Sequence, residues 1–346
     1  MKLSRRSVLG GLAGTAALAT PFVARAQTME LVMVGYGSVQ DEPLKRAGEE
    51  LARRNPGVTL EVIGGLSTEA LAQIKAAQGA SPYHLAVMGS PAIINAQNEG
   101  VLEPLDFSKI PNYANVVPSF KPYGYDIGCP ISFSGIGIAY NADAVETPPE
   151  TWEDLWNPEY AGRVGMCRPS SNLGLGAVAA VGEAFFGKQD AFAESLSKWQ
   201  ELDPLVGRSP GLLQQMLERG EIDLCPMWHD NTAIAASTGL PFKYAKVSGP
   251  GPLMLPTSIV QFINSDASDL IHEFADILLQ PENQLQASGA PVFFGPVVEG
   301  VDPPAEAAEF LLSTPEEQSV MSSLDWPLIA PGRSALVEDF DRTFGV

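Results

Sequence analysis

Trp228-His229-Asp230 places an aromatic ring and a carboxylate at the end of an apolar stretch that begins at Ile222. A carboxylate can hold an ammonium through a charge-assisted hydrogen bond, and the face of an indole ring attracts a cation. Trp228 and Asp230 together therefore predict a binding site for an amine. The alternative for Asp230 is to cap the Ala-rich helix that the sequence predicts over Thr232–Ser237.

Small polar and aromatic residues also lie beside other apolar stretches, in both halves of the chain. For each Ser or Asn the alternative is plain helix capping, which is compatible with binding because a helix N-terminus presents free N–H groups to an anion. For Trp228 the alternative is a core position. Aromatic walls with a few directed polar groups are typical of a small-molecule cleft. We therefore predict ligand contacts from Tyr36, Ser38, Gly89, Ser90, Ser132, Phe133, Ser134, Ser170, Ser171, Asn172, Trp228, Asp230, Asn231, Thr257 and Ser258.

The sequence offers little to an enzyme or to a metal site. Its histidines, His84, His229 and His272, are far apart in the chain, which gives weak support to a zinc site or a histidine-based triad. The sequence has no Walker or GxGxxG motif. We expect a protein that is not an enzyme and that uses neither a cofactor nor a metal.

The elements that position the first of these residues alternate between strand and helix. Apolar runs, turn residues and helix caps predict this order over Glu30–Tyr36, Leu44–Arg54, Val58–Ile63, Ser67–Ala77, Leu85–Met88 and a last helix, which Ser90 caps, which starts at Pro91 and which ends just before Gly100. Such alternation predicts a parallel sheet that binds its ligand beyond the carboxyl ends of its strands. The predicted ligand loops are therefore Tyr36–Ser38 and Gly89–Ser90.

Two stretches without charged residues separate this unit from a second one. Cys129–Tyr140 is rich in Ile, Phe, Ser and Gly, and Leu253–Ile263 is similar in character. Such composition suits buried strands whose glycines allow close approach. We interpret both as crossover strands between two lobes. In the second lobe, Ser170–Asn172 precede a Gly/Ala-rich helix.

Residues 1–26 have the features of an export signal. Arg5 and Arg6 precede an apolar run, and Ala24-Arg25-Ala26 fits a cleavage site. The pair of arginines resembles a twin-arginine signal, and an ordinary secretory signal is the alternative. The apolar run is shorter than the roughly 20 residues that a membrane span needs. A folded substrate meets the reducing cytoplasm first, which favours buried thiols over a disulfide for Cys129, Cys167 and Cys225.

The charge of the chain argues against nucleic acid as a partner. Removal of residues 1–26 takes away four basic residues and no acidic one, so the formal net charge of −20 becomes −24. Nucleic-acid binding needs a basic face. The 320 residues that remain of 346 exceed one typical core and predict two domains or lobes.

Three motifs in order resemble a known family. Gly135-Ile136-Gly137-Ile138-Ala139-Tyr140-Asn141 is similar to its "GIGYN" segment, Pro149 to Trp156 to its "P-x-[ST]-W-x-D-L" segment, and Gly100 to Leu105 to its "G-x-L-x-P-[LI]-D" stretch. The chain thus resembles the periplasmic solute-binding proteins of ABC importers, in the type II group that includes binders of polyamines, ferric iron, thiamine and aminophosphonates.

The resemblance implies an α/β fold with two lobes of mixed, largely parallel sheets, joined by two crossover strands that let the lobes close on a solute. It implies a periplasmic receptor that works with membrane permease subunits, and we expect a monomer. The expected segments are a signal peptide over 1–26, lobe 1 over 27–130 and 251–300, lobe 2 over 131–250, and C-terminal helices on lobe 2 over 301–346.

The resemblance leaves the ligand open. Iron binders of this type carry a Tyr-Tyr pair, which this sequence lacks. Polyamine binders resemble the chain around Trp228 and Asp230, but they carry further acids where this chain has Gly37-Ser38 and Thr257-Ser258. We expect an amine-bearing zwitterion, such as an amino acid or an aminophosphonate, with its anionic end near Ser170–Asn172. A polyamine is the first alternative, and an exported enzyme or a sensory binding subunit on a similar fold are the others.

Overall fold

A computed structural model of the protein describes residues 29–64, 73, 74, 76 and 82–345. The expected signal segment, residues 1–26, and most of the expected helix Ser67–Ala77 lie outside the described residues. Over the described residues, no helix is both long enough and apolar enough to cross a membrane.

The strands of the described part form one large mixed sheet. Their order is β2-β1-β3-β10-β5-β8, with β4 and β11 added to β10 and β9 added to β5. A separate small sheet consists of β6 and β7. The bounds are β1 (Met29–Gly35), β2 (Val58–Gly64), β3 (Leu85–Gly89), β4 (Leu102–Glu103), β5 (Cys129–Asn141), β6 (Gly165–Cys167), β7 (Leu205–Gly207), β8 (Leu224–Trp228), β9 (Phe242–Ala245), β10 (Leu253–Phe262) and β11 (Ser322–Ser323).

The two crossover strands predicted from the sequence are β5 and β10. They pair with each other in antiparallel fashion, and β10 also pairs antiparallel with β3, while β5 pairs antiparallel with β8 and β9. Among the strands of the described residues, parallel pairing joins β1 with β2 and β3, β10 with β11, and β6 with β7. The sheet is mixed as expected, but its centre is antiparallel because the chain leaves lobe 1 along β5 and returns along β10.

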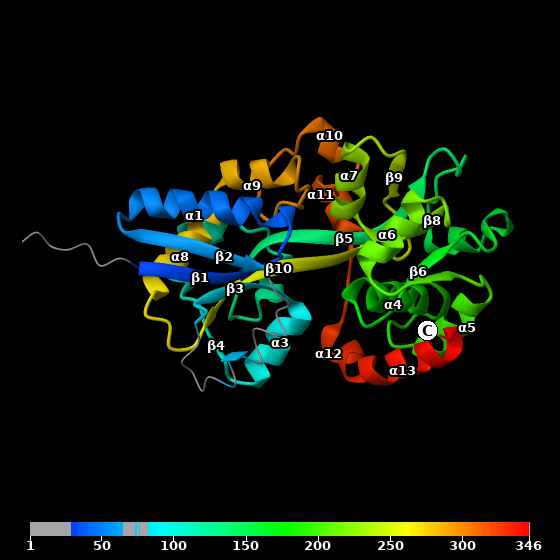
Figure 1. The fold of residues 1–346 in the computed structure, drawn as a ribbon, viewed down its shortest axis with the longest axis horizontal. Helices are drawn as coiled ribbons and strands as arrows, with labels where there is room; N and C mark the ends of the chain where they lie inside the picture. The colour runs from blue at the N-terminus through cyan, green and yellow to red at the C-terminus, as the bar shows by residue number, and fades with distance from the viewer. Residues whose placement is uncertain (1–28, 65–72, 75, 77–81, 346) are drawn as a thin grey trace, which may run out of the picture.

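Helices cover both ends of this sheet (Figure 1). Around lobe 1 they are α1 (Glu42–Arg54), α3 (Ser90–Asn98), α8 (Ser268–Leu278) and α9 (Pro281–Ser288). Around lobe 2 they are α4 (Asn172–Phe186), α5 (Phe192–Gln200), α6 (Pro210–Glu218) and α7 (His229–Ser237). The last part of the chain adds α10 (Ala305–Ala308), α11 (Pro315–Ser319), α12 (Trp326–Ile329) and α13 (Arg333–Phe344).

Separate hydrophobic cores lie at the two ends of the sheet. Leu31, Leu44 and Phe274 belong to the lobe 1 core, whereas Trp152 and Trp199 belong to the lobe 2 core. The lobe 2 core also contains apolar side chains from α12 and α13, which lie beside lobe 2 in Figure 1. The residue boundaries of the lobes stay predictions.

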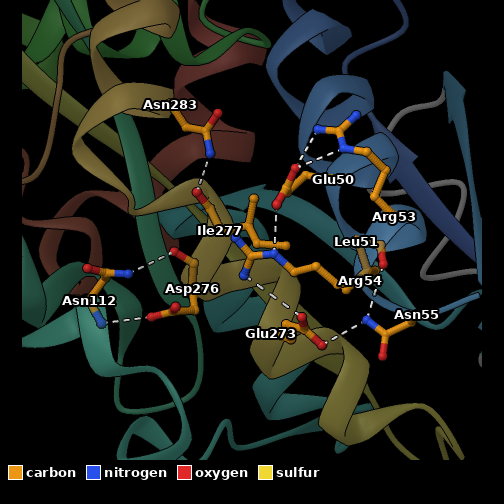
Figure 2. A network of polar contacts seen from close by, with 10 residues as sticks. All are labelled: Glu50, Leu51, Arg53, Arg54, Asn55, Asn112, Glu273, Asp276, Ile277 and Asn283. Atoms are coloured by element: carbon orange, nitrogen blue, oxygen red, sulfur yellow. Dashed lines mark hydrogen bonds and ion pairs between the residues drawn. The ribbon is translucent and has the colours of Figure 1, made fainter.

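Polar contacts fix the outer helices of lobe 1 to one another (Figure 2). Arg54 on α1 pairs with Glu50 at 2.8 Å and with Glu273 on α8 at 3.9 Å. The Asn55 side chain, just past the end of α1, donates to Glu273 at 2.9 Å. These side chains are partly exposed, so solvent screens the ion pairs and they add little stability. They mark where α1, which follows the loop after β1, lies against α8.

Side chains at two helix starts make the capping contacts that their residue types favour. Thr151 and Asp154 form a capping box at η5 (Trp152–Trp156), and Ser209 caps α6 by accepting a hydrogen bond from the Leu212 N–H. The cysteines Cys129, Cys167 and Cys225 are free and buried, as the sequence favoured. Burial raises the pKa of each of these thiols.

Candidate functional site

A cavity of about 250 Å³ lies where the two lobes face each other across β5 and β10. Lobe 1 contributes the loops after β1 and β3, and lobe 2 contributes the starts of α4 and α7. The lining residues are Tyr36, Gln40, Gly89, Ser134, Asn172, Trp228, Asp230, Asn231, Leu255, Pro256 and Thr257. Residues from distant parts of the sequence thus meet in one place, because the strand ends and helix starts of both lobes point to it.

Asp230 is the carboxylate of this cavity. It lies in the first turn of α7, and its side chain is 1% exposed. Its Oδ2 accepts a hydrogen bond from Gln40 Nε2 at 2.5 Å, whereas its Oδ1 is buried and makes no hydrogen bond within the described part of the chain. Burial raises the pKa of Asp230 to about 6, against the opposing effects of the nearby Ser134 hydroxyl and backbone amides. An incoming hydrogen-bond donor with positive charge would satisfy the free oxygen.

The structure also answers the capping alternative for Asp230. Helix α7 begins at His229, its N-cap residue is Trp228, and no side-chain capping bond is present there. Asp230 therefore does not cap α7 but sits inside its first turn, where a negative charge interacts favourably with the helix dipole. The carboxylate is left available to the cavity.

His229 fixes the start of α7 from the other side. Its Nδ1 accepts a hydrogen bond from the Gly135 N–H on β5 at 2.8 Å, so the proton lies on Nε2, which donates to the Phe293 carbonyl at 3.1 Å. Full burial lowers the pKa of His229 to about 3, and the ring is neutral. The histidine thereby anchors Trp228 and Asp230 to the crossover strand.

Trp228 ends β8, and its backbone pairs with Ile136 of β5. Its side chain is half-buried, packs against the lobe 2 core and lines the cavity beside Asp230. Trp228 thus packs against the core and also forms part of the cavity wall. The aromatic and acidic side chains that the sequence paired do lie together.

Lobe 1 places Tyr36 through a buried aspartate. Asp41 accepts hydrogen bonds from the Tyr36 N–H at 2.6 Å and from the Gly37 N–H at 2.9 Å, which folds the chain back directly after β1. The Tyr36 hydroxyl is 3.0 Å from Thr257 Oγ1, which lies 2.8 Å from Ser132 Oγ. Burial raises the pKa of Tyr36 to about 12, so the phenol is neutral. This hydroxyl chain ties lobe 1 to both crossover strands.

Sequence reasoning missed Gln40, Leu255 and Pro256. Gln40 belongs to η1 (Val39–Asp41), and its amide spans 190 positions of sequence to reach Asp230. A polar residue soon after the first predicted strand was the available signal. Leu255 and Pro256 are apolar residues of β10 next to Thr257, and they carried no signal because their types suit any buried strand.

The start of α4 forms the other lobe 2 wall. Ser171 caps this helix by accepting a hydrogen bond from the Gly174 N–H at 3.0 Å. Asn172 lines the cavity, and its Oδ1 accepts from Arg333 Nη1 at 3.1 Å. Arg333 also donates to the Ser170 carbonyl. With its oxygen turned to Arg333, the Asn172 side chain keeps its NH₂ group as a donor.

The structure brings together only part of the predicted contact set. Those that line the cavity are Tyr36, Gly89, Ser134, Asn172, Trp228, Asp230, Asn231 and Thr257. The others have different surroundings. Ser132 lies behind Thr257, and Phe133 stacks on Phe120 in the core. Ser38 accepts a hydrogen bond from the Gln40 N–H, and Ser170 and Ser171 lie at the cap of α4. Ser90 and Ser258 are buried at 2% and 0% exposure and are not among the lining residues. Over the described part of the chain, no cluster of three or more His, Cys, Asp or Glu could hold a metal ion.

Two lobes joined by a pair of strands, with a small cavity of polar and apolar lining between them, define a two-lobed solute-binding fold. Residues 46–310 match the sequence profile of the bacterial extracellular solute-binding proteins. The chain belongs to this family, which makes it a binding protein rather than an enzyme.

Known relatives agree with this placement. The spermidine/putrescine-binding periplasmic protein of Escherichia coli (strain K12) is 27% identical over 169 residues, which are 46% of this chain and 48% of that protein. The chain thus spans about half the length of the curated relatives it matches. An ABC transporter structure from Clostridium perfringens superposes with a TM-score of 0.74 at 20% identity, over 91% of this chain and 99% of that one. A GABA receptor superposes with a TM-score of 0.72 at 17% identity, over 91% and 97%. These likenesses confirm the expected type II fold.

Proposed function

We propose that the protein is a periplasmic receptor of an ABC importer and that it captures a small amine-bearing solute, with a zwitterion favoured. The observation that carries the proposal is the Asp230 carboxylate, which is 1% exposed and has one oxygen free of hydrogen bonds. Leaving a buried carboxylate oxygen without a partner costs free energy, and a ligand ammonium would recover it.

The amine end of the ligand belongs beside Trp228 and Asp230. Trp228 offers a ring surface next to the carboxylate, and a cation held between an aromatic face and a carboxylate gains from both contacts. The cavity of about 250 Å³ is small, which suits a solute of a few heavy atoms better than a large one.

The anionic end belongs beside Asn172. The Asn172 NH₂ group is available as a donor, and the N-terminus of α4 carries the positive end of a helix dipole. Arg333 adds a positive charge behind Asn172. A carboxylate or phosphonate therefore has favourable surroundings there.

Closure of the lobes follows from a ligand that touches both. Tyr36 and Gln40 come from lobe 1, whereas Asn172 and Asp230 come from lobe 2. A solute that contacts both sets binds the closed arrangement better and shifts the population toward it. Permease subunits would recognise the closed form.

A polyamine is the second candidate, supported by the spermidine/putrescine-binding relatives. The cavity lining argues against it, because Asp230 is the single carboxylate among the lining residues of the described chain. A second ammonium would be desolvated without a partner, which is costly.

Mass spectrometry of solute released from protein purified without additions tests the proposal first. Calorimetry then compares 4-aminobutyrate, 2-aminoethylphosphonate, putrescine and spermidine with the wild type and with Asp230→Ala. We expect a zwitterion to bind and the Asp230→Ala variant to lose at least about 100-fold in affinity. Asp190→Ala is the matched control, since it removes an exposed carboxylate of lobe 2. Binding of polyamines alone would reject the zwitterion, and an unchanged affinity in Asp230→Ala would reject the amine site.

A further inference from the structure

Gln40 is the lobe 1 residue that reaches the carboxylate of lobe 2. Its Nε2 donates to Asp230 Oδ2 at 2.5 Å, and its Oε1 accepts from Ser38 Oγ at 3.2 Å. The backbone N–H of Gln40 in turn donates to Ser38 Oγ at 3.2 Å. Both ends of the amide are thus assigned by their partners, and the NH₂ group is the end that faces the cavity.

From this arrangement we infer that Gln40 is a specificity-determining residue, which limits the cavity to a single ammonium and so selects monoamines over diamines. The inference rests on the proposed amine-binding function. Gln40 occupies one oxygen of Asp230 and leaves the other for one ligand ammonium. Its NH₂ group presents a partial positive charge at the place where a second ammonium would need an acceptor.

The described neighbours of Gln40 do not supply the acceptor that a second ammonium would need. Among the described residues, the lobe 1 side of the cavity otherwise consists of Tyr36, whose phenol is neutral, and Gly89. Asp41 is close in sequence, but its two oxygens are taken by the Tyr36 and Gly37 N–H groups. A diamine would therefore bury its second charge against donors, and such an unpaired charge is an effective means of excluding a competing ligand.

The Gln40→Glu variant tests the inference, because glutamate has nearly the shape of glutamine and replaces the donor by a carboxylate. Butylamine and putrescine are the probes, since they differ by one amino group on the same four-carbon chain. Calorimetry gives the ratio of putrescine affinity to butylamine affinity for the wild type, Gln40→Glu and the control Gln286→Glu. Gln286 is an exposed residue of α9 outside the cavity, so its change adds the same charge at a distance.

We expect Gln40→Glu to raise this ratio at least about tenfold, because the second ammonium gains a carboxylate partner, while Gln286→Glu leaves the ratio unchanged. A smaller rise, or an equal rise in the control, overturns the inference. Thermal unfolding without ligand verifies that both variants are folded.

Failure of the proposed function is distinguishable from failure of this inference. If the wild type binds neither 4-aminobutyrate nor either probe, the proposed function is wrong, and the Gln40→Glu variant is then judged on whether it alone binds putrescine. If the wild type binds monoamines but Gln40→Glu leaves the ratio in place, amine binding stands and the role of Gln40 does not.

Discussion

The two lobes contribute to the cavity in different ways. Lobe 2 supplies the charge, in the buried carboxylate of Asp230, together with the ring of Trp228. Lobe 1 supplies neutral groups, among them the Tyr36 phenol and the Gln40 amide. On the proposed function, lobe 2 recognises the charge of the ligand, whereas lobe 1 closes over the ligand and limits which other groups can enter the cavity.

Each lobe positions its contribution with one buried polar side chain next to it in sequence. In lobe 1, Asp41 binds the backbone of Tyr36 and Gly37. In lobe 2, His229 joins the start of α7 to Gly135 and Phe293. The lobe 1 contact is local, since it spans five residues or fewer, while the contacts of His229 span 94 and 64. Lobe 2 thus depends on tertiary structure for the placement of its charge.

The largest effect that we expect comes from His229→Ala. The change leaves the Gly135 N–H and the Phe293 carbonyl buried without partners and opens a cavity, so the free energy of unfolding should fall by roughly 4 kcal/mol. Ligand affinity should fall as well, because α7 loses its anchor. Urea denaturation and calorimetry measure the two quantities.

His272→Ala is the matched variant in lobe 1. His272 is 3% exposed and accepts a hydrogen bond from the Asp106 N–H at 2.7 Å, away from the cavity. We expect a comparable loss of stability with unchanged ligand affinity. Equal losses of affinity in both variants would show that His229 acts through stability alone.

The pH dependence of stability should separate Asp230 from the rest of the chain. Because its pKa is raised to about 6 from an ordinary value of 3.8, the folded protein binds the proton more tightly than the unfolded chain, and the ionised carboxylate destabilises the fold above pH 6. Asp230→Asn should therefore be more stable than the wild type at pH 8, by about 3 kcal/mol, with the gap closing as the pH falls toward 4.

His229 contributes with the opposite sign. Its pKa is lowered to about 3 from 6.5, so the stability that the neutral ring provides is lost as the pH falls below 6.5. Removal of Asp230 leaves this loss unopposed and makes the variant the more acid-sensitive protein. Urea denaturation without ligand at pH 8, 6 and 4 measures both slopes, with Asp190→Asn as the exposed control. A gap between Asp230→Asn and wild type that stays constant over this range would contradict the assignment.

Asp230→Asn should also weaken ligand binding. The amide keeps an oxygen for Gln40 but loses the charge that would hold an ammonium, so we expect a loss of about 100-fold, or about 2.7 kcal/mol, by calorimetry at pH 8. The wild type should approach this weak binding as the pH falls below about 6, because Asp230 then becomes protonated. If Asp230→Asn binds the ligand as tightly as the wild type does, the charge of the ligand is recognised outside lobe 2.

Much of the fold could be predicted from local sequence. Helix caps such as Ser171 and Ser209, and the uncharged runs that became β5 and β10, act over a few residues and are visible in the chain. The antiparallel pairing of these strands could not be predicted in the same way. It depends on how a chain that leaves lobe 1 returns to it, which is a property of the topology and not of any one segment.

The site shows the same limit at the level of single residues. Successive residues of a strand face opposite sides, so Ser132, Phe133 and Ser134 cannot all face the cavity, and Phe133 points into the core. Thr257 and Ser258 divide in the same manner. The sequence indicated which segments border the cavity, but the choice of face depends on strand register, and the Gln40–Asp230 contact depends on the approach of the two lobes.

Tyr36→Phe gives the smallest effect and sharpens the comparison from the side of lobe 1. The change removes a neutral hydroxyl that bonds to Thr257 at 3.0 Å, so ligand affinity should fall by roughly fivefold, which corresponds to about 1 kcal/mol. Tyr113→Phe, in a residue of lobe 1 that stacks on Phe107 outside the cavity, is the control and should leave affinity unchanged. Calorimetry with the same solute measures both. A loss of ligand affinity as large as that of Asp230→Asn would mean that lobe 1 holds the charged end of the ligand. The roles that we assign to the two lobes would then have to be exchanged.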